Sequence, residues 1–194
     1  MFLNLLGAAQ GALIRASTVI PLRNVRVQSE MKSQRKQIDR ILLDSVAMKD
    51  IAQVLDLLAQ GADVNARDPE HGETPLMLAV KNRSIDIVRL LLDAGAEVDG
   101  IDDWGRTALF YAPVSAESFG ILLRAKADVH TRDKEGNTVL MRRISECASL
   151  SDVETLLQLG VDPSLQSEHK ETALDIAESL GLVRVIERLR SRAG

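Results

Sequence analysis

A short pattern, Gly-x-Thr-x-Leu, recurs along this chain at a nearly constant interval, with lysine in place of glycine in the last copy. Its threonines are Thr74, Thr107, Thr138 and Thr172, so successive copies are 33, 31 and 34 residues apart. Leucine pairs followed by a string similar to Gly-Ala-Asp-Val recur in the same phase and begin at Leu57, Leu91, Leu122 and Leu156. A period of about 33 residues predicts a stacked solenoid, because each unit can bury its apolar face only against a neighbour. This architecture excludes most enzyme folds.

The most complete unit occupies residues 68–98. It contains, in order, Asp68, Gly72, Thr74-Pro75-Leu76, Ala79, Ile87-Val88, Leu91-Leu92 and Gly95-Ala96. This order and spacing resemble the ankyrin repeat, and the resemblance covers about residues 34–194. It implies an all-α solenoid of helix–turn–helix repeats with projecting β-turn fingers, used as a scaffold that binds another protein. It does not imply which protein is bound.

We expect an N-terminal extension over residues 1–30 and an ankyrin repeat domain over residues 31–194. Within the domain we count five repeats, at about residues 34–66, 67–100, 101–131, 132–165 and 166–194. The last repeat interleaves its apolar positions with Arg184, Arg188, Arg190 and Arg192. Because a terminal repeat needs a polar outer face, we interpret these arginines as part of a cap in preference to a nucleic-acid site.

Local chemistry explains the recurring residue types of the second repeat. Thr74 followed by Pro75 is typical of a helix start, with threonine as the N-cap and proline at the first helical position. A second helix is expected to follow at Ser84. Gly95 is expected to end that helix, because the residue after a helix usually adopts the left-handed conformation that glycine tolerates.

The third repeat is irregular. Residues 107–128 are two positions shorter than the matching span 74–97, and Pro113 is expected to end the inner helix early. Lys126 replaces the helix-ending glycine, where a left-handed residue with a Cβ costs about 1 kcal/mol. The fourth repeat is one residue longer, around residues 147–151. Such departures in the middle of an array either mark function or reflect drift in a degenerate repeat.

The first thirty residues differ from the rest of the chain. They are mostly apolar from Phe2 to Ile14 and then contain three arginines, with no acid before Glu30. Three interpretations stay open: an arginine-bearing targeting presequence, a helix on a membrane surface, or a disordered or untranslated segment with translation starting at Met31. A secretory signal is disfavoured because no positive charge precedes the apolar run.

The composition limits the kinds of partner and of compartment that this chain is expected to have. Residues 31–194 hold 21 Lys and Arg against 27 Asp and Glu, which argues against binding a phosphate backbone. The lone Cys147 excludes an intramolecular disulfide and gives no evidence of an oxidising compartment. No stretch approaches the roughly 20 apolar residues of a transmembrane helix. We expect a monomer in the cytoplasm. Residues 1–30 are the only part of the sequence that suggests membrane contact or organelle import.

The sequence offers no catalytic site. His71, His130 and His169 lie at or near different fingers, about 10 Å or more apart, and cannot meet at one metal ion. The clustered Asp99, Asp102 and Asp103 lack the twelve-residue spacing of a calcium loop and are explained as turn formers. We therefore predict no enzyme activity, no metal and no cofactor.

Aromatic residues concentrate in the third repeat. By their match to the ankyrin pattern, Trp104 lies at a finger tip, Tyr111 on the concave side of the inner helix, and Phe110 and Phe119 in the core. Trp and Tyr are enriched at binding hot spots, so we prefer a binding role for Trp104 over packing onto the neighbouring finger. The predicted partner-binding surface consists of Arg67, His71, Glu73, Asp103, Trp104, Arg106, Tyr111, Arg132, Lys134 and Arg142.

The predicted function is a non-catalytic protein–protein interaction module that uses the fingers and inner helices of repeats two to four. The alternative is an organelle-imported or N-terminally membrane-anchored ankyrin factor that acts in the assembly of a membrane-proximal complex. Residues 1–30 distinguish the two hypotheses.

Overall fold

The computed structural model describes residues 22–146 and 149–191. The chain divides into two parts, with the boundary between Gln37 and Ile38. Within the described residues the regular structure is helical, and the only extended pairing is an isolated bridge between Arg132 and Thr138. The prediction of an all-α fold is therefore confirmed.

Helix α1, Leu22–Ala47, begins in the first part and continues into the second. Residues 28–37 are exposed, because this polar stretch has no apolar stripe to bury. Burial begins where the apolar spacing begins, and Leu42 and Val46 are completely buried. The inner helix of the first repeat is thus the C-terminal part of α1. The predicted domain boundary after residue 30 falls inside this helix, and the interpretations of residues 1–21 lie outside the described residues.

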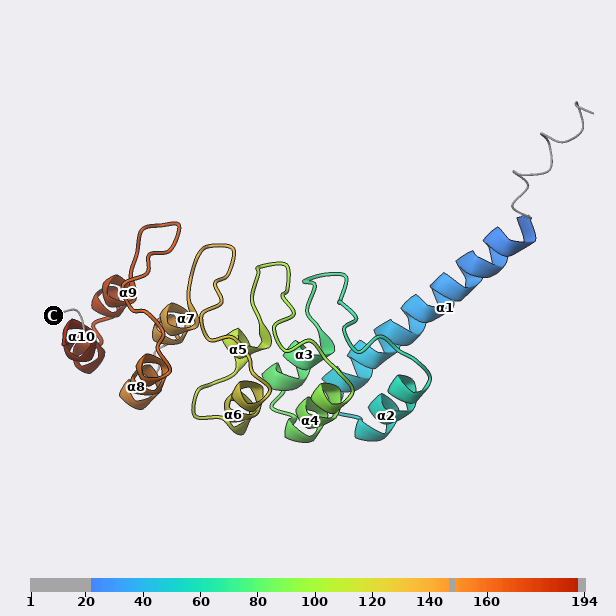
Figure 1. Ribbon diagram of the computed structural model, residues 1–194, viewed down its shortest axis with the longest axis horizontal. Helices are drawn as coiled ribbons and strands as arrows, with labels where there is room; N and C mark the ends of the chain where they lie inside the picture. Colours follow the sequence, from blue (N-terminus) through green and yellow to red (C-terminus); the bar gives the residue numbers. More distant parts are fainter. Residues whose placement is uncertain (1–21, 147–148, 192–194) are drawn as a thin grey trace, which may run out of the picture. The chain divides into compact units, whose positions relative to one another are not determined.

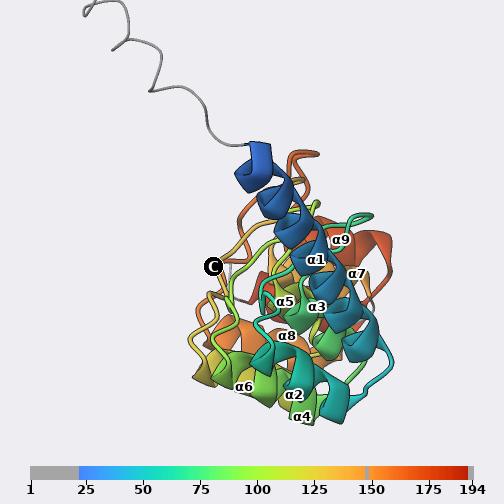
Figure 2. The same cartoon turned by 90° about the vertical axis from the view of Figure 1, so that its right-hand side faces the viewer.

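From residue 38 onward the helices form two rows. The inner row contains α3 (Pro75–Lys81), α5 (Ala108–Tyr111), α7 (Val139–Ser145) and α9 (Ala173–Ser179). The outer row contains α2 (Ile51–Ala59), α4 (Ile85–Asp93), α6 (Glu117–Arg124), α8 (Leu150–Gln158) and α10 (Val183–Arg190). Figures 1 and 2 show the rows as two layers, and the loops that precede the inner helices project from the inner row. These loops are the fingers of repeats two to five, residues 67–73, 101–106, 132–137 and 166–171.

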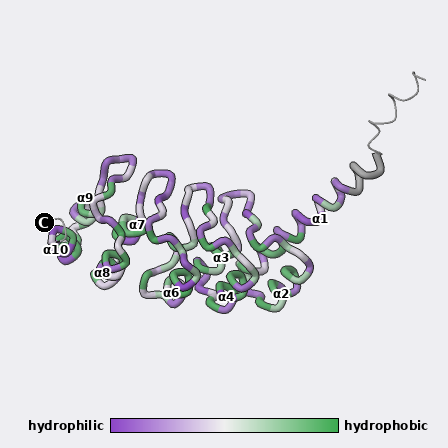
Figure 3. Tube along the Cα trace, in the orientation of Figure 1, coloured by the Kyte–Doolittle hydropathy of each residue, from purple (hydrophilic) through white to green (hydrophobic). Residues whose placement is uncertain are grey.

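The core lies between the two rows and repeats with the sequence period. Three of the four leucines of the Gly-x-Thr-x-Leu pattern, Leu76, Leu109 and Leu140, are at most 1% exposed, and the fourth, Leu174 of the last repeat, is partly buried. Phe110 and Phe119 are also buried, as predicted. Figure 3 shows hydrophobic colour concentrated on the helices and hydrophilic colour on the fingers. Burial of each large apolar side chain contributes about 1.5–3 kcal/mol, so stacking, not any single repeat, stabilises the fold.

Thr74 caps its helix as predicted, and the other recurring threonines do the same at their own inner helices, except for Thr107. The Thr74 hydroxyl accepts a hydrogen bond from the Met77 N–H at 3.3 Å, with Pro75 at the first helical position. Thr138 caps α7 in the same way through the Met141 N–H at 3.3 Å. Thr107 makes no such bond, and its buried hydroxyl has no partner among the described residues.

The helix ends also follow the prediction. Gly95 has a φ of 90° and Lys126 a φ of 67°, so lysine occupies the left-handed position that glycine fills in the second repeat. Helix α5 spans only four residues, and Ala112 adopts an extended conformation before Pro113. The residue before a proline disfavours the helical region, which explains the early end.

A buried arginine from the next repeat completes this short helix. Arg143 in α7 is 8% exposed and donates a hydrogen bond from Nη2 to the carbonyl of Phe110. Its Nη1 lies 3.0 Å from Oε2 of Glu146. Because an early helix end leaves carbonyls without partners, Arg143 supplies the donor that the missing turn would have provided. Burial lowers the pKa of Arg143 from its usual value.

The arginines of the last helix are partly paired. The Nε of Arg188 lies 3.3 Å from Oε1 of Glu154, and the Nη2 of Arg190 lies 2.6 Å from Oε1 of Glu178. Arg184 is exposed. Arg192, like Cys147, lies outside the described residues. Pairing to acids of the same chain supports the interpretation of these arginines as a polar cap.

Candidate protein-binding face

The fingers and inner helices form one face of the array, and the ten predicted binding residues lie on it. The structure shows that most of them already contact other residues of this chain. Some of these residues form hydrogen bonds between successive fingers, and others form hydrogen bonds within one finger. Two of them line a groove.

Arginine side chains connect successive fingers. Arg67 donates from Nη1 to the carbonyl of Ile101, and its Nη2 lies 2.9 Å from Oδ1 of Asp103. Arg132 connects the fingers of the fourth and fifth repeats in a similar way, because its Nη2 donates to the carbonyl of Gln166. Arg67 and Arg132 therefore brace the fingers, a role that sequence analysis missed. Their equivalent place, just before the finger aspartate, is the sequence signal that could have revealed it.

Gly72 fits beneath the first of these braces. It has a φ of 67°, in the left-handed region. A Cβ at this position would lie 2.4 Å from both the Arg67 Nη2 and the Asp103 Oδ1. The glycine of the Gly-x-Thr-x-Leu pattern is thus required here by both backbone conformation and close contact.

Backbone hydrogen bonds set the register between fingers. The Asp103 N–H donates to the His71 carbonyl at 2.9 Å, and the Lys134 N–H donates to the Trp104 carbonyl at 2.8 Å. The Glu168 N–H donates to the Glu135 carbonyl of the fourth repeat at 2.8 Å. The fingers of repeats two to five are therefore one hydrogen-bonded surface, which lowers the entropy lost when a partner binds.

A buried aspartate organises each of two fingers. Asp102 is 2% exposed, and its Oδ1 accepts hydrogen bonds from the Trp104 N–H at 2.8 Å and the Arg106 N–H at 2.9 Å. Asp133 accepts comparable bonds from the N–H groups of Glu135 and Asn137. These bonds support the prediction that the finger aspartates form turns.

Asp68 has the same role in the finger of the second repeat. Burial alone would raise the pKa of Asp68, but hydrogen bonds from the N–H groups of Glu73, Glu70 and His71 outweigh it, and the pKa is lowered. The ionised form of Asp68 is therefore the one that the folded finger stabilises.

Tyr111 is half-buried and its hydroxyl has an internal partner. It donates a hydrogen bond to Oδ2 of Asp102. The ammonium of Lys81 lies 5.1 Å from the centre of its ring and 2.6 Å from Oε1 of Glu73. Burial, then the hydrogen bond to Asp102, raises the pKa of Tyr111 above its usual value. Only the partly exposed ring remains for a partner.

Trp104 forms a stack at the finger tips. Its ring centre lies 5.2 Å from that of His71 with an interplanar angle of 22°, and the Arg106 guanidinium lies 5.6 Å from the ring. Trp104 is nevertheless 40% exposed. It packs onto the neighbouring finger and still presents apolar surface to solvent.

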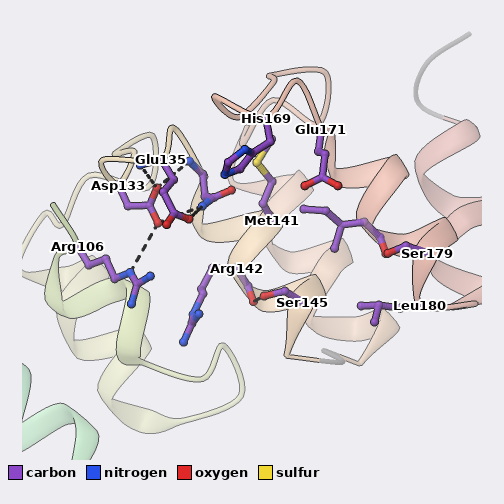
Figure 4. A pocket seen from close by; sticks show the side chains of 12 residues that line it. Arg106, Asp133, Glu135, Met141, Arg142, Ser145, His169, Glu171, Ser179 and Leu180 are labelled. Carbon is purple, nitrogen blue, oxygen red and sulfur yellow. Dashed lines mark hydrogen bonds and ion pairs between the residues drawn. The ribbon is translucent and has the colours of Figure 1, made fainter. Parts of the chain in front are cut away.

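A groove of about 360 Å³ lies beside the fourth and fifth fingers. Figure 4 shows Asp133, Glu135, His169 and Glu171 on its finger side, with Arg142 and Ser145 of α7 opposite. Arg106 and Arg142 are the two predicted residues that line it. The other lining residues were not in the predicted surface: Asp133, Glu135, Asn137, Met141, Ser145, His169, Glu171, Ile176, Ser179 and Leu180.

The described residues offer neither a metal-binding cluster nor a membrane-spanning helix. Within residues 22–146 and 149–191, no group of three or more His, Cys, Asp or Glu side chains is placed to hold a metal ion. Across those same ranges, every helix is too short or too polar to cross a membrane.

Two layers of short paired helices with projecting, mutually bonded fingers define a helical solenoid scaffold. A family model described as ankyrin repeats (3 copies) matches residues 42–118. Residues 42–118 of this chain are therefore ankyrin repeats. Ankyrin repeats generally mediate protein–protein interactions, and the family is typically non-enzymatic. The total of five repeats stays a prediction, because the match covers only part of the array.

Three relatives illustrate the similarity. The Neurogenic locus Notch protein of Drosophila melanogaster is 45% identical over 95 residues, 46% of this chain and 4% of that protein. The Ankyrin repeat and SOCS box protein 6 of Homo sapiens is 39% identical over 92 residues, 43% of this chain and 22% of that protein. The mitochondrial disaggregase of Bos taurus is 31% identical over 156 residues, 77% of this chain and 23% of that protein. The chain therefore spans less than a quarter of each of these relatives.

Proposed function

We propose that this chain is a non-catalytic interaction module that binds a partner protein through the fingers and inner helices of repeats two to four. The observation that supports this proposal is Trp104, 40% exposed on a finger that is hydrogen-bonded to both neighbours. A large aromatic side chain held on a rigid support can bury area at low entropy cost, as binding anchors do.

The charged residues of the face have a different role. Lys134 is exposed, and among the described residues its side chain makes no hydrogen bond or ion pair. Arg67 and Arg132 each donate a hydrogen bond to a backbone carbonyl of the neighbouring finger. We therefore assign Lys134 to orientation and association rate, and the two arginines to support of the surface.

The test uses the full chain as bait, followed by identification, purification and affinity measurement of the captured partner. Trp104→Ala is expected to weaken binding by about 2 kcal/mol or more, roughly thirtyfold, with an unchanged thermal melt. Arg184→Ala, on the exposed side of the outer helix α10, is the control and should bind like the parent. A Trp104→Ala variant that binds like the parent would place the interface elsewhere.

The second hypothesis is an organelle-imported factor. It is motivated by the arginine-bearing, acid-poor residues 1–30 and by the similarity to a relative whose name places it in mitochondria. The measurement is the intact mass of the protein from its native source. A start at residue 1 or 31 would contradict cleavage on import, whereas a start between them would support it.

A further inference from the structure

The groove beside the fourth and fifth fingers differs in charge from the rest of the face. Its lining contains the arginines Arg106 and Arg142 and the acids Asp133, Glu135 and Glu171. With histidine neutral, the lining therefore has an excess of negative charge.

The arginines are already matched by acids of the same chain. Arg106 Nε lies 3.6 Å from Oδ2 of the buried Asp133. Arg142 Nη2 lies 2.8 Å from Oε1 of Glu146, one turn further along α7. A carboxylate from a partner would have to compete with both acids, so the arginine end of the groove is poorly suited to bind one.

The carboxylates on the finger side are not matched in this way. Glu135 and Glu171 are exposed and come from successive fingers. Glu135 accepts a hydrogen bond from the Asn137 amide at 3.2 Å. In the described part of the chain, no cationic side chain lies within ion-pair distance of either glutamate. The unmatched charge of the groove is therefore negative.

The groove also has apolar surface next to these acids. Leu180 is 44% exposed, Ile176 is half-buried, and the buried Met141 lines the same groove. Lysine and arginine combine an alkyl stem, which packs on apolar surface, with a charged head that reaches past it. A basic side chain thus matches both features of the groove, whereas a short acidic side chain matches neither.

We propose that this groove binds a lysine or arginine side chain from a segment of the partner protein, with its stem on Ile176 and Leu180 and its charge between Glu135 and Glu171. This inference rests on the proposed function and specifies the chemistry of the partner. It moves part of the interface to the fifth repeat, outside the surface predicted from the sequence.

The test is selection of a random dodecapeptide library displayed on phage against the full chain. Selected peptides are expected to share a basic residue. The affinity of the tightest one is then measured for the double variant Glu135→Gln/Glu171→Gln, which keeps side-chain shape and fold. We expect a loss of about tenfold or more, because hydrogen bonds to charged groups are the stronger class, and weaker binding at high salt.

Glu187→Gln is the matched control, since Glu187 is an exposed glutamate on the outer helix of the same repeat, away from the groove. It should bind the peptide like the parent. Selection of peptides without basic residues, or equal affinity for parent and double variant, would overturn the proposal. If the peptide binds the Trp104→Ala variant weakly but binds the double variant like the parent, the proposed function stands. Only the proposal that the groove binds a basic side chain would then be wrong.

Discussion

The second and third repeats share one pattern but reach a stable fold by different means. In the second repeat, a helix of seven residues begins with the Thr74 cap and the next one ends at Gly95. In the third, the inner helix has four residues, Thr107 forms no cap, and Lys126 takes the left-handed position. The comparison shows that the helix ends of the regular repeat are satisfied by residues of that repeat, whereas the short inner helix of the irregular repeat takes a donor from its neighbour, Arg143.

The largest expected effect tests the core that both repeats share. Phe110→Ala should lower the free energy of unfolding by about 3–5 kcal/mol, because the ring is fully buried. Met77→Ala, at the same place in the second repeat, should cost about 2–5 kcal/mol. Urea denaturation measures both. A near-zero cost at Phe110 would show that the irregular repeat is loosely packed.

The dependence on the neighbouring repeat is tested at Arg143. Arg143→Met should cost about 1–3 kcal/mol, because the Phe110 carbonyl loses its donor. Arg142→Met is the control on the same helix; it breaks a partly exposed ion pair with Glu146 and should cost less than about 1 kcal/mol. Equal costs in urea unfolding would refute the idea that Arg143 completes the third repeat.

Substitutions at the helix ends should change the free energy of unfolding by a smaller amount, with opposite signs in the two repeats. Lys126→Gly should raise the free energy of unfolding by about 1 kcal/mol, because glycine adopts a positive φ without strain. Gly95→Ala should lower it by about the same amount. Thermal melts of both variants provide the check, and a loss of stability in Lys126→Gly would contradict it.

The helix starts give the smallest effect. Thr74→Val should cost about 1 kcal/mol through loss of the cap. Thr107→Val should be nearly neutral, because it removes a buried hydroxyl that has no partner among the described residues and keeps the side-chain shape. If the two substitutions cost the same amount in denaturation experiments, the repeats are capped alike and the comparison fails at this position.

The candidate site was only partly predictable. The pattern placed Trp104 on a finger and Arg142 on an inner helix, where the structure has them. It did not show that the Tyr111 hydroxyl donates a hydrogen bond to Asp102, or that Glu171 of the fifth repeat lines the groove. Residue type and position in a repeat indicate which face a side chain is on, but they do not indicate whether its polar atoms are already bonded.

One missed contact left a trace in the sequence. Arg143 stands five residues after its threonine, where Ala79, Ala112 and Ala177 stand in the other repeats, and these alanines are completely buried. A charged residue at a small, buried position must find a partner inside the protein. The sequence therefore contained the anomaly, but the partner, a backbone carbonyl, could not be read from it.

The sequence alone determined the period, the helix starts at Thr74 and Thr138, and the early helix end at Pro113, because these depend on bonds and conformations within a few residues. The tertiary structure decided which donors and acceptors meet across repeats, as with Arg67 and Asp103 or Arg143 and Phe110. Those pairs are separated by about one period, so they depend on the spacing and rotation of stacked repeats, which only the packing of the helices sets.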